Sequence, residues 1–184
     1  MGYQLSKTIV LVGLMGAGKT AVGNLLGQKL GAAFLDSDHE IEKAANMSIA
    51  EIFTRDGEEF FRVKESQVLE RLLKGAPCVL STGGGAFMSD VNRILISKRS
   101  VAVWLKADID LLWSRVRQKN TRPLLETENP YKSLLNLYKK RNPIYAKAEV
   151  VVESQKGLGV EEMASKVVTT LLNTPNSGVT EKVG

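Results

Sequence analysis

Residues 13–20, with the sequence G-L-M-G-A-G-K-T, match the pattern of a nucleotide phosphate-binding loop, G-x-x-x-x-G-K-[ST]. The apolar run 9–12 before this loop predicts a buried strand, and the amphipathic segment 21–30 after it predicts a helix. A loop between a strand and a helix can direct successive backbone N–H groups and the positive end of the helix at phosphate oxygens. The motif in this setting predicts an α/β fold that binds a nucleoside triphosphate.

Three glycines and two polar side chains of this loop have the chemistry that polyphosphate binding needs. Gly13, Gly16 and Gly18 carry no side chain that would block the approach of phosphate oxygens. Lys19 can reach the β- and γ-phosphates, and the hydroxyl of Thr20 can hold Mg²⁺. We expect the nucleotide phosphates to contact six consecutive residues, Gly16, Ala17, Gly18, Lys19, Thr20 and Ala21.

The rest of the sequence alternates between short apolar runs and helical patterns. Further strands are predicted at 33–35, 78–81, 101–105 and 150–152. Helices are predicted at 39–45, from a capping box at 48–51 to a break at 56–57, at 58–73, from 108 onwards and at 160–172. Such alternation is typical of a parallel sheet with helices on both faces, and 184 residues suit one such domain.

Two polar segments interrupt the pattern. Residues 120–129, with Pro123 inside and Pro130 after them, lack periodicity and predict a mobile loop between two helices. Residues 173–184 are polar and terminal, so we expect a disordered tail after a domain that spans 1–172.

Composition and the N-terminal sequence indicate the cellular compartment of the protein. No apolar run approaches the ~18 residues that would span a bilayer, and the N-terminus lacks the pattern of a signal peptide. The single cysteine, Cys78, excludes an internal disulfide and suits a reducing compartment. Because it precedes the apolar residues Val79 and Leu80, we expect it to be a small core residue. We therefore expect a cytoplasmic protein without a membrane partner, acting as a monomer.

Positive charge is concentrated in one part of the sequence. The chain carries a net charge of +5, yet nine basic and only two acidic side chains lie between residues 115 and 147. This excess implies an anionic ligand, either nucleic acid or a nucleotide together with an acidic small molecule. The phosphate-binding loop favours the second alternative. The sequence also shows no RNA-binding aromatic signature and no clear recognition helix, which argues against nucleic acid. A guanine-reading N-K-x-D motif, which a GTPase switch would carry, is also missing.

Polar and glycine residues follow two of the predicted strands. Asp36 and Asp38 come at the end of the strand at 33–35, where ligands bind in open parallel sheets. One carboxylate can serve Mg²⁺ and the other can accept a hydrogen bond from a substrate hydroxyl, unless one of them only caps the next helix. Residues 83–85 are three glycines after the strand at 78–81, which indicates close approach of a ligand more than a flexible linker.

Three arginines outside the loop are candidates for anion binding. Arg62 lies three residues before Glu65 on a predicted helix, where the carboxylate can hold the guanidinium, although an ordinary surface ion pair has the same spacing. Arg122 lies on the polar loop and can move onto a transferring phosphoryl group, unless it is simply solvated. Arg141 ends a helix and can form a forked pair with a carboxylate.

The chain resembles the shikimate kinases from about residue 8 to residue 172. The resemblance rests on motifs in the family's order: G-L-M-G-A-G-K-T, F-L-D-S-D, S-I-A-E-I-F, E-x-x-F-R, S-T-G-G-G, R-P-L-L and R-N-P-I-Y. It implies a nucleoside monophosphate kinase-like α/β fold with a five-stranded parallel sheet in the order 2-3-1-4-5. A substrate-binding helical region at about 37–65 and a mobile lid at about 116–129 would complete it.

The resemblance implies a reaction and a nucleotide site. The family transfers the γ-phosphate of ATP to the 3-hydroxyl of shikimate, a step of chorismate and aromatic amino acid biosynthesis. Asp36 would lie near Mg²⁺ together with Thr20, and Arg115 would stack on adenine. Arg122 would come from the lid to join Lys19 on the phosphates.

The resemblance also implies an acceptor site. Asp38 would bind shikimate hydroxyls and take the proton, which makes Lys19, Asp38 and Arg122 the expected catalytic residues. Arg62 and Arg141 would hold the shikimate carboxylate, and Gly83, Gly84 and Gly85 would contact shikimate through their backbone. The alternative is a gluconate kinase-like enzyme that acts on another small hydroxy acid, a family that lacks the S-T-G-G-G turn combined with R-P-L-L.

Overall fold

A parallel sheet forms the centre of the molecule in the computed structural model, which describes residues 2–119 and 123–183. Its five strands are β2 (Thr8–Val12), β3 (Phe34–Asp36), β4 (Val79–Ser81), β5 (Ser100–Lys106) and β6 (Val150–Glu153). They lie in the order β3-β4-β2-β5-β6, and every neighbouring pair is parallel. Numbered within this sheet the order is 2-3-1-4-5, so the predicted fold class is confirmed.

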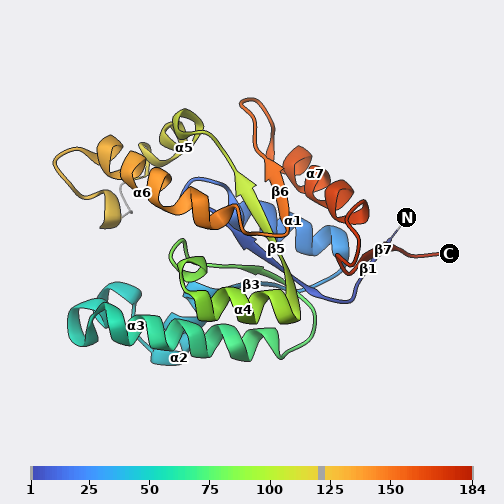
Figure 1. The fold of residues 1–184 in the computed structure, drawn as a ribbon, viewed down its shortest axis with the longest axis horizontal. Coiled ribbons are helices and arrows are strands. Elements are labelled where there is room, and N and C mark those ends of the chain that lie inside the picture. Colours follow the sequence, from blue (N-terminus) through green and yellow to red (C-terminus); the bar gives the residue numbers. More distant parts are fainter. Residues whose placement is uncertain (1, 120–122, 184) are drawn as a thin grey trace.

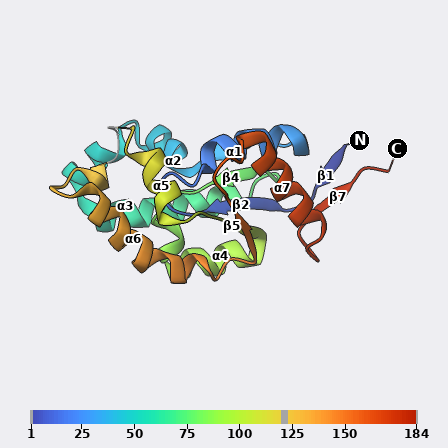
Figure 2. The same ribbon diagram turned by 90° about the horizontal axis from the view of Figure 1, so that it is seen from above.

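Helices cover both faces of this sheet and extend beyond one end of it. They are α1 (Lys19–Leu30), α2 (Ser37–Ala45), α3 (Ile49–Leu73), α4 (Asp90–Arg99), α5 (Ile109–Val116), α6 (Pro130–Tyr145) and α7 (Val160–Leu172), with short 3-10 helices η1 (Ala86–Met88) and η2 (Pro123–Leu125). α1 and α7 pack together on one face, and α4 lies on the other (Figure 2). α5, α6 and the first part of α3 lie towards the end away from the two termini, and α3 then runs along the same side of the molecule as α4 (Figure 1).

The burial of the central strand explains why it anchors the fold. All five residues of β2 are buried, because the strand lies between β4 and β5 with helices on both faces. Cys78, just before β4, is buried as well, and burial raises the pKa of its thiol. This confirms the expectation that the single cysteine is a core residue.

Local signals explain the start and the bend of α3. Ser48 and Glu51 form the predicted capping box, in which each side chain accepts the other residue's backbone N–H. Gly57 has φ +84° inside the helix, which makes a kink where the sequence predicted a break. The predicted break is therefore present, as a non-helical residue between the two helical parts of α3.

The expectation of a disordered C-terminal tail is wrong for part of it. β1 (Tyr3–Leu5) and β7 (Val179–Glu181) pair antiparallel and join the two ends of the chain. The backbone N–H of Ser6 also donates to the carbonyl of Gly178, and Val179 is buried. Pairing with β1 satisfies backbone groups that a polar tail would otherwise leave to water.

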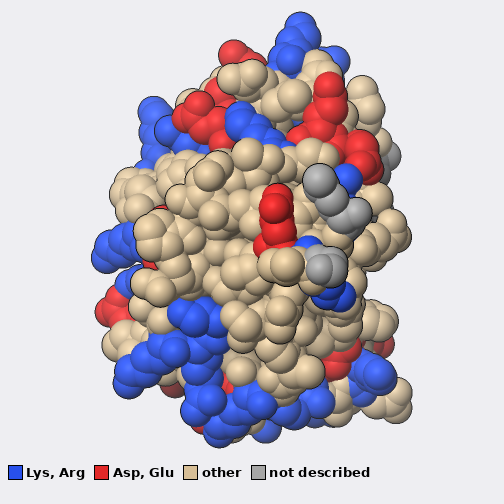
Figure 3. Space-filling view, turned by 90° about the vertical axis from the view of Figure 1, so that its right-hand side faces the viewer, with Lys and Arg blue, Asp and Glu red and all other residues tan. Residues whose placement is uncertain are grey.

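Part of the positive charge has a structural explanation. Figure 3 shows the face that carries the termini, and Lys and Arg side chains gather along its lower edge. This edge is on the side of the molecule where α3 and α4 lie in Figure 1. The last turns of these helices carry Arg71, Lys98 and Arg99. Basic side chains at a helix C-terminus are stabilised by its partial negative charge, and Arg71 also lies 3.7 Å from Glu40. In the described part of the chain, no helix is both long and apolar enough to cross a bilayer.

Candidate active site

The phosphate-binding loop connects β2 to α1 at the carboxyl end of the sheet. Gly13, Gly16 and Gly18 have φ values of +146°, +83° and +91°, which side chains rarely adopt. A Cβ atom on Gly16 would lie 2.8 Å from Cγ1 of Val116, so the loop packs tightly against α5. The N-cap of α1 is Gly18, which has no side chain to accept the first N–H groups of the helix. These donors and the helix dipole therefore suit an anionic ligand.

Lys19 lies folded over this loop. Its Nζ donates to the carbonyl oxygens of Gly13 at 2.6 Å and Leu14 at 3.1 Å. Thr20 and Ala21 are exposed in the first turn of the same helix. The lysine and the threonine hydroxyl are thus both placed at the loop where the sequence predicted phosphate and metal binding.

Asp36 and Asp38 have different surroundings. Oδ1 of Asp36 accepts the backbone N–H groups of Asp38 at 2.9 Å and His39 at 3.3 Å, so Asp36 is the N-cap of α2. Burial raises the pKa of Asp38 to about 6, and the charge of Asp36 adds to this shift. The charges of Lys19 and Arg62 oppose this rise in the pKa of Asp38.

Each glycine of the turn after β4 faces a different charged side chain. A Cβ atom on Gly83 would lie 2.6 Å from Oδ1 of Asp38, and one on Gly84 would lie 2.8 Å from Nη1 of Arg141. A Cβ atom on Gly85 would lie 2.6 Å from both terminal nitrogens of Arg62. We call residues 83–85 the glycine turn. The structure thus brings together all the residues expected to bind the acceptor, from four separate parts of the chain.

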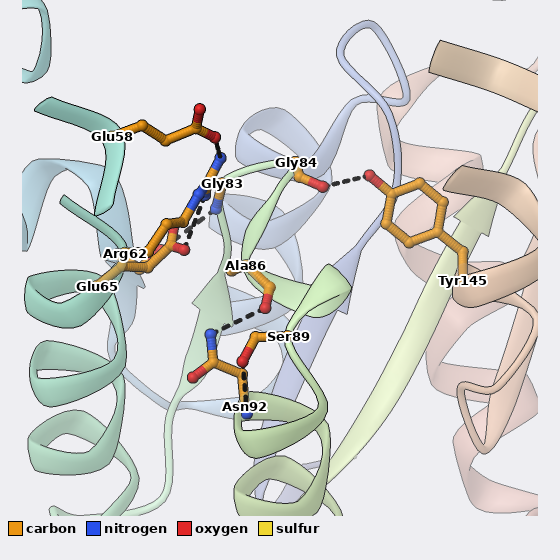
Figure 4. A network of polar contacts seen from close by, with 10 residues as sticks. Glu58, Arg62, Glu65, Gly83, Gly84, Ala86, Ser89, Asn92 and Tyr145 are labelled. Carbon is orange, nitrogen blue, oxygen red and sulfur yellow. Dashed lines mark hydrogen bonds and ion pairs between the residues drawn. The ribbon is translucent and has the colours of Figure 1, made fainter. Parts of the chain in front are cut away.

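Arg62 is held in place by carboxylates of its own helix. Its Nη1 donates to Oε1 of Glu65 at 2.9 Å, and its Nη2 lies 3.5 Å from Oε1 of Glu58 (Figure 4). Glu65 is only 2% exposed, and burial raises its pKa although Arg62 opposes the shift. The predicted pair is therefore a half-buried anchor that aims the guanidinium at the glycine turn.

Three residues around the glycine turn received no role from the sequence. The Tyr145 hydroxyl donates to the Gly84 carbonyl at 2.5 Å, and Asn92 Nδ2 donates to the Ala86 carbonyl at 2.9 Å (Figure 4). The backbone N–H of Gly83 donates to Oγ of Ser37 at 3.3 Å. A signal existed only for Tyr145, which lies four residues after Arg141 and therefore on the same helix face.

Arg115 bridges two segments on the nucleotide side. Its Nη1 donates to the carbonyl of Gly16 at 3.0 Å, and its Nη2 donates to Oγ of Ser154 at 3.1 Å. Partial burial lowers the pKa of its guanidinium. Arg115 therefore lies beside the phosphate loop, which suits its predicted contact with adenine. Arg122, the remaining candidate, lies outside the described residues.

The family model of the shikimate kinases matches residues 15–172 of this sequence. The chain belongs to the shikimate kinase family. Shikimate kinases of Cereibacter sphaeroides and Ruegeria pomeroyi are 61% and 59% identical to it over 173 and 167 residues. These matches cover 94% and 91% of this chain and 86% of each relative. The resemblance predicted from the motifs is confirmed.

Solved structures agree with this family assignment. The shikimate kinase from Acinetobacter baumannii in complex with shikimate has a TM-score of 0.86 and 40% identity, over 92% of this chain and 95% of that one. A gluconokinase from Sinorhizobium meliloti has a TM-score of 0.61 and 16% identity, over 92% and 94% of the two chains. The gluconokinase therefore shares the fold only, and the comparisons favour shikimate kinase over the gluconate kinase alternative.

Proposed function

We propose that this chain transfers the γ-phosphate of ATP to the 3-hydroxyl of shikimate, giving shikimate 3-phosphate and ADP. The observation that best supports this proposal is that Asp38, Arg62 and Arg141 converge on the glycine turn. This turn follows β4, which pairs with the strand β2 that leads into the phosphate-binding loop. Shikimate is a small acid with three hydroxyl groups. Two guanidinium groups match its carboxylate, and a carboxylate and backbone groups match its hydroxyls. The product would serve chorismate and aromatic amino acid biosynthesis.

The chemistry follows from the charges around the reacting groups. Lys19 and the first N–H groups of α1 would stabilise negative charge on the β- and γ-phosphates as the phosphoryl group moves. Asp38 is mostly ionised at neutral pH with a pKa of about 6, so it can accept a hydrogen bond from the attacking hydroxyl. Asp38 would hold the acceptor hydroxyl, and Lys19 would hold the γ-phosphate that this hydroxyl attacks. Arg122 would join from the lid, and Arg115 would stack on adenine.

The residues at the loop fit a magnesium ion bound with the nucleotide. Thr20 offers a hydroxyl and Asp36 a carboxylate, whose Oδ1 is committed to capping α2. Mg²⁺ is usually held by one or two protein oxygens together with phosphates and water. Over residues 2–119 and 123–183, no cluster of three or more His, Cys, Asp or Glu suits a metal. Thr20 and Asp36 would hold Mg²⁺, which supplies charge neutralisation at the phosphates when it is bound.

We further propose that the chain works as a cytoplasmic monomer without a nucleic-acid or membrane partner. The acceptor-site residues all come from one chain and converge on a space suited to a small molecule. Arg62 and Arg141 face the acceptor site, and Arg115 contacts the phosphate loop. In this proposal their ligands are the shikimate carboxylate and the nucleotide. Arg115 and Arg141 belong to the basic stretch 115–147, so part of that positive charge has a role in binding small anions in this proposal.

Shikimate should be phosphorylated at least ~100-fold better than its methyl ester, as kcat/KM, because the neutral ester leaves two shielded guanidinium groups without their partner. Arg62→Ala and Arg141→Ala should each remove most of this preference and leave the KM for ATP nearly unchanged. Arg62→Lys should not restore it, since an ammonium cannot form the planar fork. Steady-state kinetics with acid and ester measures the effect.

Arg71→Ala is the matched control for this experiment. Arg71 is an exposed arginine of the same helix, 3.7 Å from Glu40, and its removal should leave the preference intact. An Arg62→Ala enzyme that still discriminates as well as the wild type would show that Arg62 does not bind the carboxylate.

Gly85→Ala should raise the KM for shikimate by about tenfold with little change in the KM for ATP. The added methyl group would lie 2.6 Å from both terminal nitrogens of Arg62, so the guanidinium has to move. Gly75→Ala, just beyond α3, is the control. A Cβ atom at Gly75 would lie 3.3 Å from the carbonyl oxygen of Leu72 and would meet no charged side chain within 4 Å. Equal KM values for the two variants would contradict close approach at the glycine turn.

A further inference from the structure

Tyr145 is the last residue of α6, and its side chain is fully buried. Its ring neighbours those of Phe87 in η1 and Trp104 in β5, with centroid separations of 6.5 and 6.0 Å. The hydroxyl points away from solvent and donates to the Gly84 carbonyl at 2.5 Å (Figure 4). A fully buried ring with two aromatic neighbours leaves this hydroxyl little freedom, so it fixes the carbonyl it contacts.

Arg141 lies one helical turn before Tyr145 and faces the same glycine. A Cβ atom on Gly84 would lie 2.8 Å from Nη1 of Arg141 and 3.6 Å from the Tyr145 hydroxyl oxygen. Burial raises the pKa of Tyr145 to about 12, although the nearby Arg141 charge opposes the shift. The phenol therefore keeps its proton for Gly84, and its oxygen can accept an N–H from the guanidinium, which only donates.

The glycine turn needs such contacts because three successive glycines have little conformational preference of their own. Side chains hold its backbone on both sides of Gly84. Ser37 accepts the Gly83 N–H, and Asn92, which is completely buried, donates to the Ala86 carbonyl. Tyr145 holds the middle of the turn and is the member of this set that also faces an arginine of the acceptor site.

We propose that Tyr145 is a positioning residue for the phosphoryl acceptor, whose buried hydroxyl holds the Gly84 carbonyl and the Arg141 guanidinium in the arrangement that binds the acceptor carboxylate. This inference rests on the proposed function and adds a residue to it. It assigns a role in acceptor recognition to a side chain that would otherwise count as core.

The test is a one-atom change, Tyr145→Phe, which keeps the ring contacts. The KM for shikimate should rise about tenfold, while kcat and the KM for ATP stay within about twofold of the wild-type values. The preference for shikimate over its methyl ester should fall severalfold, because Arg141 is no longer held at the carboxylate. Tyr145→Leu is a second variant without the hydroxyl and should show the same split between the two substrates.

Ser100→Ala is the matched control. The Ser100 hydroxyl is also buried and donates to a backbone carbonyl, that of Ile96 at 2.7 Å, at the opposite end of β5. Its loss should lower the thermal midpoint by a similar amount and leave both KM values and the acid preference unchanged. All assays are run below the midpoints of the variants, so that only folded enzyme is compared.

A double-mutant cycle tests whether Tyr145 acts through Arg141. In an Arg141→Ala background, Tyr145→Phe should change the KM for shikimate by no more than about twofold, because the group it positions is gone. Full additivity of the two changes would overturn the proposed coupling. A Tyr145→Phe enzyme that matches Ser100→Ala, or that loses ATP and shikimate affinity equally, would overturn the positioning role itself. A wild-type enzyme that does not phosphorylate shikimate would instead refute the proposed function.

Discussion

Replacing Lys19 with alanine should lower kcat by about a thousandfold in a protein that still folds. The lysine Nζ lies over the phosphate loop, 2.6 Å from the Gly13 carbonyl, so its charge is already in place before the reaction. Preorganised charge at the phosphates stabilises the transition state, and its loss costs about 4 kcal/mol of barrier height. The measurement is steady-state ADP release with shikimate, with circular dichroism to verify the fold.

Lys29→Ala controls for loss of a lysine from the same helix. Lys29 lies in the last turn of α1 and pairs with Glu161, away from the phosphate loop. This variant should keep a kcat within about twofold of the wild type, since a surface ion pair contributes little. Near-normal kcat in folded Lys19→Ala would mean that the loop does not hold the transferring phosphate.

Asp38→Asn should have opposite effects on activity and stability. Activity should fall by about a thousandfold, because an amide can neither take the proton of the attacking hydroxyl nor attract it electrostatically. Stability at pH 7 should rise by on the order of 2 kcal/mol, since burial makes the Asp38 charge unfavourable in the folded state. Kinetics and denaturant unfolding of the same preparations measure both effects.

The pH dependence of stability gives the sign of this effect. The pKa of Asp38 is about 6 in the folded protein against an ordinary 3.8, so the folded state binds the proton more tightly. The wild type should therefore lose its disadvantage relative to Asp38→Asn as the pH falls from 7 through about 6 towards 4. Asp110→Asn, an exposed aspartate of α5, should show no such convergence. Parallel stability curves for the wild type and Asp38→Asn would contradict a carboxylate whose charge is disfavoured in the folded state.

Sequence reasoning worked best where the signal is local. The phosphate loop, the capping box at Ser48 and the bend at Gly57 each depend on a few neighbouring residues, and the structure has all three. The ion pair between Arg62 and Glu65 follows from helical spacing alone. The order of the strands, in contrast, came only from the resemblance to a family, because strand pairing is a long-range property.

Long-range contacts explain what the sequence did not predict. β1 and β7 have three residues each and pair across almost the whole chain, so no local pattern marks them. α4 buries only Asn92 and Ile96, which leaves too narrow an apolar stripe to predict a helix. Tyr145 reads as a core aromatic until the fold brings the Gly84 carbonyl to its hydroxyl.

The most direct test of the proposed function is ADP release by the purified wild-type protein with ATP, Mg²⁺ and one acceptor at a time. Shikimate, gluconate and nucleoside monophosphates are compared at matched concentrations, with product identity verified by mass. The convergence of Asp38, Arg62 and Arg141 on the glycine turn predicts a kcat/KM for shikimate at least ~100-fold above the other acceptors. No ADP release with shikimate, or equal or faster release with gluconate or a nucleoside monophosphate, would contradict it.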